Sequence, residues 1–230
     1  RTRTRRPSSA PELTEAALAA QLSNVLMRIG HAKQYLFMSV KASDWDVIMG
    51  QAWARGVDAA RVRVGFGVHP RWAQTVAPGV GFEQKLTDCL SNVPRAIVGE
   101  IGLDRSKRFK HFFDSHQLPL FRAQLRIAAS MSRPVSIHCV KADAGLVQTF
   151  QDSMAVNGDG LPPAICLHSF AGSFETLKRI ISIVEGNRRK SSGSGAGKET
   201  ASAHVAPRVF VGFNAWTNLY KKGAGDFVRQ

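Results

Sequence analysis

The chain has 230 residues, 44% of them hydrophobic, which is enough for one substantial core, so a single domain is expected. The 31 Lys and Arg residues against 17 Asp and Glu give a formal net charge of +14, which favours a polyanionic partner. No stretch approaches the roughly 20 uninterrupted apolar residues of a membrane-spanning helix, so no membrane association is expected. The three cysteines have no CxxC spacing, which argues against a disulfide framework and a thiolate zinc site.

Two segments have compositions that cannot build a core. Residues 1–11 form a basic tail that is rich in Arg and Ser and that we expect to be flexible. The same composition resembles an organelle transit sequence, so we expect an intracellular protein, cytoplasmic or nuclear, with a mitochondrial location as an alternative. Residues 187–207 are basic and rich in Gly and Ser, which predicts a flexible insertion. Its glycines imitate a phosphate-binding loop, but Glu199 replaces the required Ser or Thr, so no nucleotide site is expected.

Between these segments, β-rich apolar runs alternate with stretches that carry apolar residues three or four positions apart, which predicts parallel β/α units. In chain order we expect a helix at 13–29, strands at 35–40 and 62–68, a helix at 83–90, a strand at 96–100, a helix at 113–130, a strand at 134–138, a helix at 142–155, a strand at 164–168, a helix at 174–185 and a strand at 209–213. Both an open doubly wound sheet and a closed TIM-type (β/α) barrel fit this alternation. Both place functional residues at the carboxyl ends of the strands.

Polar residues that can bind metal end four of the predicted strands: His69, Glu100, His138 and His168. One such residue would only mark where a strand leaves the core, but four at equivalent points favour a common site. In a parallel barrel they converge on one mouth, and two imidazoles with a carboxylate suit Zn²⁺ or Mn²⁺. A bound divalent ion lowers the pKa of its water, and a second ion can stabilise a leaving oxygen. This pattern predicts phosphoester hydrolysis.

Four motifs stand at the ends of successive predicted strands: GVHP at 67–70, VGEIGLD at 98–104, VSIHC at 135–139 and LHSFAGS at 167–173. In order and spacing they resemble the strand-end motifs of the TatD deoxyribonucleases, and VGEIGLD is the most specific of them. The stretch with Gln117, Phe121, Gln124 and Leu125 is also similar, so the resemblance covers about residues 35–215. It implies a TIM-type (β/α) barrel and a metal-dependent hydrolase that cleaves phosphodiester bonds of nucleic acid, DNA in preference to RNA, with a metal-activated water.

The resemblance also implies roles for individual residues. Glu100, His138 and His168 would be both the catalytic residues and the ligands of divalent metal, two ions of Mg, Mn or Zn, with Glu100 bridging the pair. His69 would line the pocket and contact substrate. Arg71 and Lys141 would contact phosphate, with a solvated basic rim as the alternative reading of these two cations.

Asp104 closes the VGEIGLD motif. It follows the predicted strand, so we expect it to cap a loop or to support the ligands indirectly.

The sequence departs from the TatD pattern at both ends. The family begins with a strand that ends in a His-x-His pair, whereas residues 13–29 predict a helix with an apolar stripe. The family's late Asp ligand has only Asp226, in a polar tail, as a poor substitute. We therefore expect the barrel to be incomplete in this chain. The sequence would be a fragment of an active enzyme, a barrel completed by a partner protein, or a degenerate paralogue, and the missing strands favour the fragment.

Two other functions use the same features. A catalytically degenerate TatD-like barrel would act as a basic binding or structural protein for nucleic acid or ribonucleoprotein. An amidohydrolase that acts on a small molecule would share the fold. Loss of activity on Glu100→Ala distinguishes hydrolysis from scaffold binding, because scaffold binding responds to salt and to deletion of the basic tail.

Overall fold

The computed structural model describes residues 34–50, 61–155, 160–191 and 208–212. The predicted basic tail, the predicted helix at 13–29 and residues 192–207 of the predicted insertion lie outside these described residues.

Six strands form one parallel sheet. They are β1 (Tyr35–Met38), β2 (Val62–Phe66), β3 (Ile97–Asp104), β4 (Val135–Val140), β5 (Ala164–His168) and β6 (Arg208–Val211). Their order in the sheet follows the chain, from β1 to β6. A doubly wound sheet reverses its strand order in the middle, whereas a β/α barrel adds each strand beside the previous one. The predicted TIM-type barrel is therefore confirmed, and it is open between β1 and β6 in the described part of the chain.

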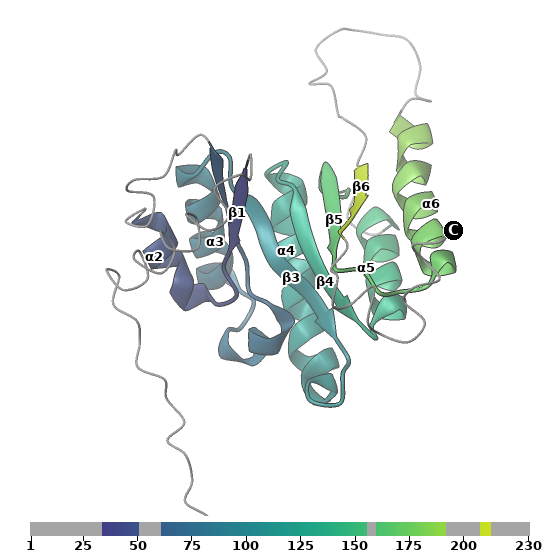
Figure 1. Cartoon of the computed structure of the whole chain (residues 1–230), viewed down its shortest axis with the longest axis horizontal. Helices are drawn as coiled ribbons and strands as arrows, with labels where there is room; N and C mark the ends of the chain where they lie inside the picture. Colours follow the sequence, from purple (N-terminus) through teal and green to yellow (C-terminus); the bar gives the residue numbers. More distant parts are fainter. Residues whose placement is uncertain (1–33, 51–60, 156–159, 192–207, 213–230) are drawn as a thin grey trace, which may run out of the picture.

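The longer helices are α3 (Val80–Asn92), α4 (Leu118–Ser130), α5 (Asp143–Ala155) and α6 (Phe174–Ser191), and a short helix α2 (Trp45–Met49) follows β1. Each helix from α3 to α6 packs beside the next one, so these four cover the same face of the sheet (Figure 1). Four short helical segments lie in the connections that leave β1, β2 and β3: η1 (Ala42–Asp44), η4 (Pro70–Thr75), η5 (Lys110–Phe112) and η6 (Phe113–Gln117). These connections, and not the long helices, therefore lie next to the carboxyl ends of β1, β2 and β3.

The core lies between the helices and the sheet, where the periodicity of the sequence placed apolar residues. Phe121 and Leu125 of α4, one turn apart, are buried, as are Ile137 and Ile165 on neighbouring strands. Full burial of each such side chain contributes roughly 1.5–3 kcal/mol before the entropy of ordering is subtracted. At the edges of the sheet, Leu36 and Phe210 are exposed.

Strand β3 is longer than the sequence predicted. We expected it to end at Glu100, but it continues to Asp104, because Ile101 and Leu103 are buried and pair in register with β4. The register shifts between Val98 and Ile101, so Glu100 lies at an irregularity of the strand instead of its end.

Gly102 allows β3 to pass close to β4. It has a φ of 135°, and a Cβ atom at this position would lie 2.0 Å from the backbone oxygen of His138. Glycine alone fits both conditions, which gives the second glycine of VGEIGLD a physical role.

Helix α6 extends to Ser191, beyond the predicted end at Glu185 and five residues into the segment expected to be a flexible insertion. Leu177, Ile180 and Val184 bury one face of the helix, and Arg and Lys have high helix propensity, so nothing in 187–191 stops it. None of the helices in the described residues is long and apolar enough to cross a membrane.

Candidate active site

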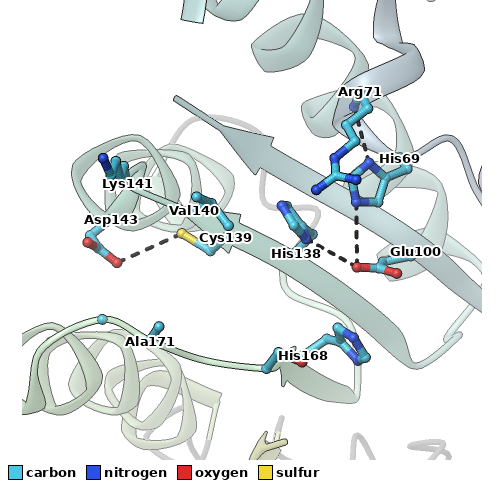
Figure 2. Close-up of a pocket in the computed structure, with 12 residues that line it drawn as sticks. His69, Arg71, Glu100, His138, Cys139, Val140, Lys141, Asp143, His168 and Ala171 are labelled. Atoms are coloured by element: carbon cyan, nitrogen blue, oxygen red, sulfur yellow. Dashed lines mark hydrogen bonds and ion pairs between the residues drawn. The ribbon is translucent and has the colours of Figure 1, made fainter. Parts of the chain in front are cut away.

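A cavity of about 510 Å³ opens at the carboxyl ends of β2 to β5 (Figure 2). The structure brings all six predicted site residues to its wall: His69, Arg71, Glu100, His138, Lys141 and His168. Cys139, Val140, Asp143, Ser169, Ala171 and Gly172 complete the lining. The strand-end pattern of the sequence therefore predicted a common pocket correctly.

His69 is fixed by the turn that follows β2. The buried amide of Gln124 accepts a hydrogen bond from the Val68 N–H at 2.7 Å and donates one to the Val68 carbonyl at 3.2 Å. The Nδ1 atom of His69 accepts a hydrogen bond from the Arg71 N–H at 3.1 Å. Since Nδ1 is an acceptor, a neutral His69 carries its proton on Nε2. Burial, helped by the neighbouring His138, lowers the pKa of His69 to about 4, so the ring is neutral at physiological pH.

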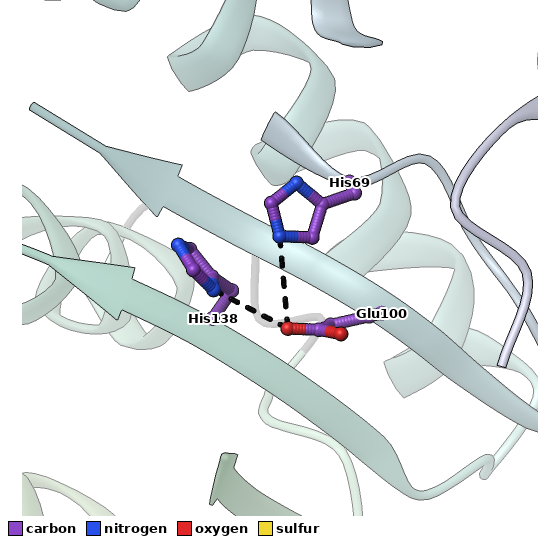
Figure 3. Close-up of side chains that lie close together, drawn as sticks. All are labelled: His69, Glu100 and His138. Atoms are coloured by element: carbon purple, nitrogen blue, oxygen red, sulfur yellow. Dashed lines mark ion pairs between the residues drawn. The ribbon is translucent and has the colours of Figure 1, made fainter. Parts of the chain in front are cut away.

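Glu100 is the centre of the titratable cluster (Figure 3). Its Oε1 atom lies 3.3 Å from Nδ1 of His138 and 3.7 Å from Nε2 of His69. Burial opposes ionisation of the carboxyl, but the hydrogen bond from His138 and the electrostatic interactions with His69 and His168 outweigh it, so the pKa of Glu100 is lowered. The carboxylate is therefore ionised and faces two imidazoles.

The ring of His138 lies between two carboxylates. While Nδ1 faces Glu100, Nε2 lies 3.6 Å from Oδ2 of Asp104, a distance too long for a good hydrogen bond. This Nε2 atom is buried and has no hydrogen-bond partner among the residues that the structure describes. Burial lowers the pKa of His138, but Asp104 and Glu100 outweigh that effect and the pKa is raised.

His69, Glu100 and His138 form a group that could hold a metal ion, with one potential ligand atom of each residue within 4.8 Å of the others. The two histidines differ in whether a ring nitrogen is available to bind metal. Nε2 of His69 carries a proton as long as Nδ1 accepts the Arg71 N–H. Nε2 of His138, by contrast, has no hydrogen-bond partner among the described residues. Glu100 and His138 are consequently the better pair of donors.

His168 lies farther from this group than the sequence led us to expect. It ends β5 directly beside His138, its register partner on β4, and it lines the same pocket. Figure 2 shows it across the pocket from His69, and it does not belong to the close group of ligand atoms found among the described residues. The structure thus brings Glu100 and His138 together, adds His69 and leaves His168 apart.

Two residues of the pocket wall have an unusual backbone. Lys141, after β4, has a φ of 53°, and Ser169, after β5, has a φ of 48°. A left-handed conformation of a non-glycine residue costs on the order of 1–3 kcal/mol and is concentrated at functional sites. Both outliers turn the chain at the ends of the strands that carry the predicted ligands.

Two buried glutamines, Gln117 and Gln124, hold the backbone around the site, although the sequence pattern indicated no such role for them. Gln124 holds the turn before His69, and Gln117 holds the backbone of Asp104, whose N–H it accepts at 2.7 Å. Their spacing was the signal that could have identified them. Two polar residues seven positions apart in a helical stretch lie on one face, here the face turned to the sheet. Asp104 lies within β3 and not in the loop where the sequence placed it, with Oδ2 3.6 Å from Nε2 of His138.

Cys139 plays the buried role that its strand context predicts. Its Sγ atom lies 3.8 Å from Oδ1 of Asp143, and burial raises the pKa of the thiol to about 12. The thiol therefore stays protonated and is a poor nucleophile.

Known proteins that are similar to this chain include TatD-related nucleases. A family model described as "TatD related DNase" matches residues 13–188. The 3'-5' ssDNA/RNA exonuclease TatD of Yersinia pseudotuberculosis is 32% identical over 51% of this chain and 42% of its own length. An uncharacterized deoxyribonuclease of Saccharomyces cerevisiae is 26% identical over 82% of this chain and 68% of its own. The chain thus spans less than half the length of the bacterial exonuclease that it matches.

A solved structure supports the fold. The TatD homologue YJJV of Escherichia coli superposes with a TM-score of 0.52 at 20% identity, covering 74% of this chain and 57% of its own. The segment that the family model matches, residues 13–188, contains all four strand-end motifs and every residue of the titratable cluster. The chain belongs to the family of TatD-related DNases.

Proposed function

We propose that this protein hydrolyses phosphodiester bonds of nucleic acid with the help of divalent metal. The observation that carries the proposal is the shared position of Glu100 Oε1, which faces imidazoles from β4 and from the turn after β2 inside an open pocket. Related proteins are named as exonucleases of single-stranded DNA and RNA and as deoxyribonucleases.

The residues fit a metal ion on chemical grounds. In the described part of the chain the buried Nε2 of His138 has no hydrogen-bond partner, and Glu100 supplies an ionised carboxylate beside the same ring. Imidazole nitrogen and carboxylate oxygen together suit Zn²⁺ and Mn²⁺, and a carboxylate-rich shell suits Mg²⁺. We propose Glu100, His138 and His168 as ligands of two ions, with Glu100 between the two histidines. When bound, such ions act as Lewis acids and lower the pKa of water toward neutrality.

The remaining pocket residues have distinct roles in this proposal. His69 donates from Nε2 toward the pocket, and its low pKa keeps it neutral while it does so. The exposed cations Arg71 and Lys141 line the pocket and supply positive charge for a phosphate. Asp104 stands behind His138 and restrains its ring. We propose DNA as the preferred polymer, with RNA as the alternative that the same experiment measures.

The test replaces the central carboxylate while keeping its shape. Glu100→Gln should lose stoichiometric Mn²⁺ or Zn²⁺ in metal analysis and lose at least about a hundredfold of its activity on a labelled oligonucleotide. Asp88→Asn, an exposed acidic residue on α3, is the matched control and should retain both properties. Equal metal content and equal activity in Glu100→Gln and the unmodified chain would contradict the proposal. DNA and RNA strands of one sequence, compared at equal concentration, give the preference.

A further inference from the structure

The connection that leaves β3 is strongly basic. Arg105, Lys107, Arg108 and Lys110 follow Asp104 within six positions, all four are exposed, and no acidic residue interrupts them. Together with Arg71, which lines the pocket, these four residues are called the basic rim.

Hydrogen bonds from buried groups hold this connection in shape. The Gln117 side chain donates to the carbonyls of Asp104 and Phe109, both at 3.0 Å, and so fixes the two ends of the turn. The Asp104 carboxylate accepts the Ser106 N–H at 2.8 Å, and the Ser106 carbonyl accepts the N–H groups of Phe109 and Lys110. The cations of the rim are therefore presented by an ordered turn, which lowers the entropic cost of binding a ligand.

An aromatic ring joins this turn to the pocket. The guanidinium of Arg71 lies 5.4 Å from the ring centre of Phe109, and that of Arg108 lies 5.3 Å from the same ring. Phe109 thus holds one cation that lines the pocket and one that lies outside it. The two guanidinium groups therefore lie around one ring, one at the pocket wall and one beyond it, and both keep N–H donors for phosphate.

The cations of the rim differ from those of the helical layer. On α3 and α4, Lys85, Arg122 and Arg126 each form an ion pair with a carboxylate. Within the described part of the chain, Arg105, Lys107, Arg108 and Lys110 have no such ion pair, and Arg71 has only a loose one with Asp104 at 3.9 Å. Positive charge is left uncompensated on the connection that reaches the pocket wall through Phe109 and Arg71, where it attracts polyanions.

An exposed aromatic residue directly follows Arg71 in the sequence. Trp72 is 36% exposed, and the Lys41 ammonium lies 4.0 Å from its ring centre. Cations that follow a backbone, together with an indole that can stack on a base, are the two elements of single-strand recognition. A duplex keeps its bases stacked on one another and cannot use such a ring without unstacking.

We propose that the basic rim and Trp72 bind a single-stranded nucleic acid, holding the phosphates that lie beyond the bond in the pocket and one base on the indole. This inference rests on the proposed function for the placement of the scissile bond, but the binding itself does not require hydrolysis. The rim would set the length of strand that is recognised, since Arg71 is the one rim cation that lines the described pocket, where Lys141 is the other cation.

The experiment measures binding without turnover. Fluorescence anisotropy of a labelled 12-nucleotide single strand in EDTA is recorded from low to moderate salt for the unmodified chain and for Lys107→Ala/Arg108→Ala/Lys110→Ala. The matched control is Lys85→Ala/Arg95→Ala/Arg126→Ala, which removes three exposed charges away from the pocket. The rim variant should weaken binding about tenfold and reduce the slope of log K against log salt by about 2, while the control changes neither by more than about twofold.

A second pair of variants tests the base contact. Trp72→Leu should weaken single-strand binding about tenfold and leave binding of the matching duplex unchanged, whereas Phe210→Leu, at a comparably exposed ring on β6, should affect neither. Equal losses in the rim and control triple variants, or duplex binding as tight as single-strand binding, would overturn the inference. Rim-dependent binding by a chain that hydrolyses no oligonucleotide with any metal would uphold it while rejecting the proposed function.

Discussion

Replacing the buried carboxylate behind His138 isolates one electrostatic contribution. In Asp104→Asn the amide oxygen can still accept the Ser106 N–H, but the negative charge beside His138 and Arg71 is lost. Burial raises the pKa of Asp104, yet the nearby His138 ring and the hydrogen bond from Ser106 outweigh it and lower the pKa from 3.8 to about 2. The side chain is 2% exposed, so solvent screens this effect little.

The shift gives both the size and the sign of the effect. A lowered pKa stabilises the fold above the unfolded value of 3.8, and this stability is lost as pH falls toward the folded value of about 2. Asp104→Asn should therefore lower the free energy of unfolding by about 2 kcal/mol at neutral pH and by only about 1 kcal/mol near pH 3.

Urea unfolding in EDTA, followed by circular dichroism at both pH values, measures the difference. Asp152→Asn removes the partner of Arg122 in an exposed pair and should cost no more than about 1 kcal/mol at either pH. A loss in Asp104→Asn that is as large near pH 3 as at neutral pH would refute the electrostatic explanation and indicate a packing defect.

Three further predictions concern the same strands. Gly102→Ala should destabilise the protein by at least about 3 kcal/mol in urea unfolding, because the new Cβ meets the His138 carbonyl, while Gly81→Ala on exposed α3 should not destabilise it. The unmodified chain should lose up to about 3 kcal/mol of stability as pH falls from about 6.5 to about 4, because the lowered pKa of His69 makes the unfolded state bind the proton first. His69→Gln should remove this loss, and equal pH profiles of the free energy of unfolding in the two proteins would contradict the reasoning. Gln124→Met should cost about 2 kcal/mol by leaving the Val68 N–H and carbonyl unpaired, and a neutral result would mean that water replaces the amide.

Much of the fold was predictable because the spacing of apolar residues within each segment indicates whether it forms a strand or a helix. All six strands and the four long helices lie where apolar spacing places them, although their ends shift by a few residues. The choice between a doubly wound sheet and a barrel was not accessible in this way, since both have the same elements in the same order. Only strand neighbours distinguish them, and these are long-range contacts.

The sequence by itself determined which residues gather at the pocket, because the carboxyl ends of parallel strands meet at one edge and four of the strands carry a recognisable motif there. Tertiary structure decided which of those residues contact one another and which ring nitrogens carry protons. The register shift in β3 turns Glu100 toward His69 as well as His138, and a backbone N–H fixes the tautomer of His69. Asp104, within the strand, reaches the far side of the His138 ring. These relations depend on distances of a few ångströms between segments far apart in the chain, which residue spacing does not specify.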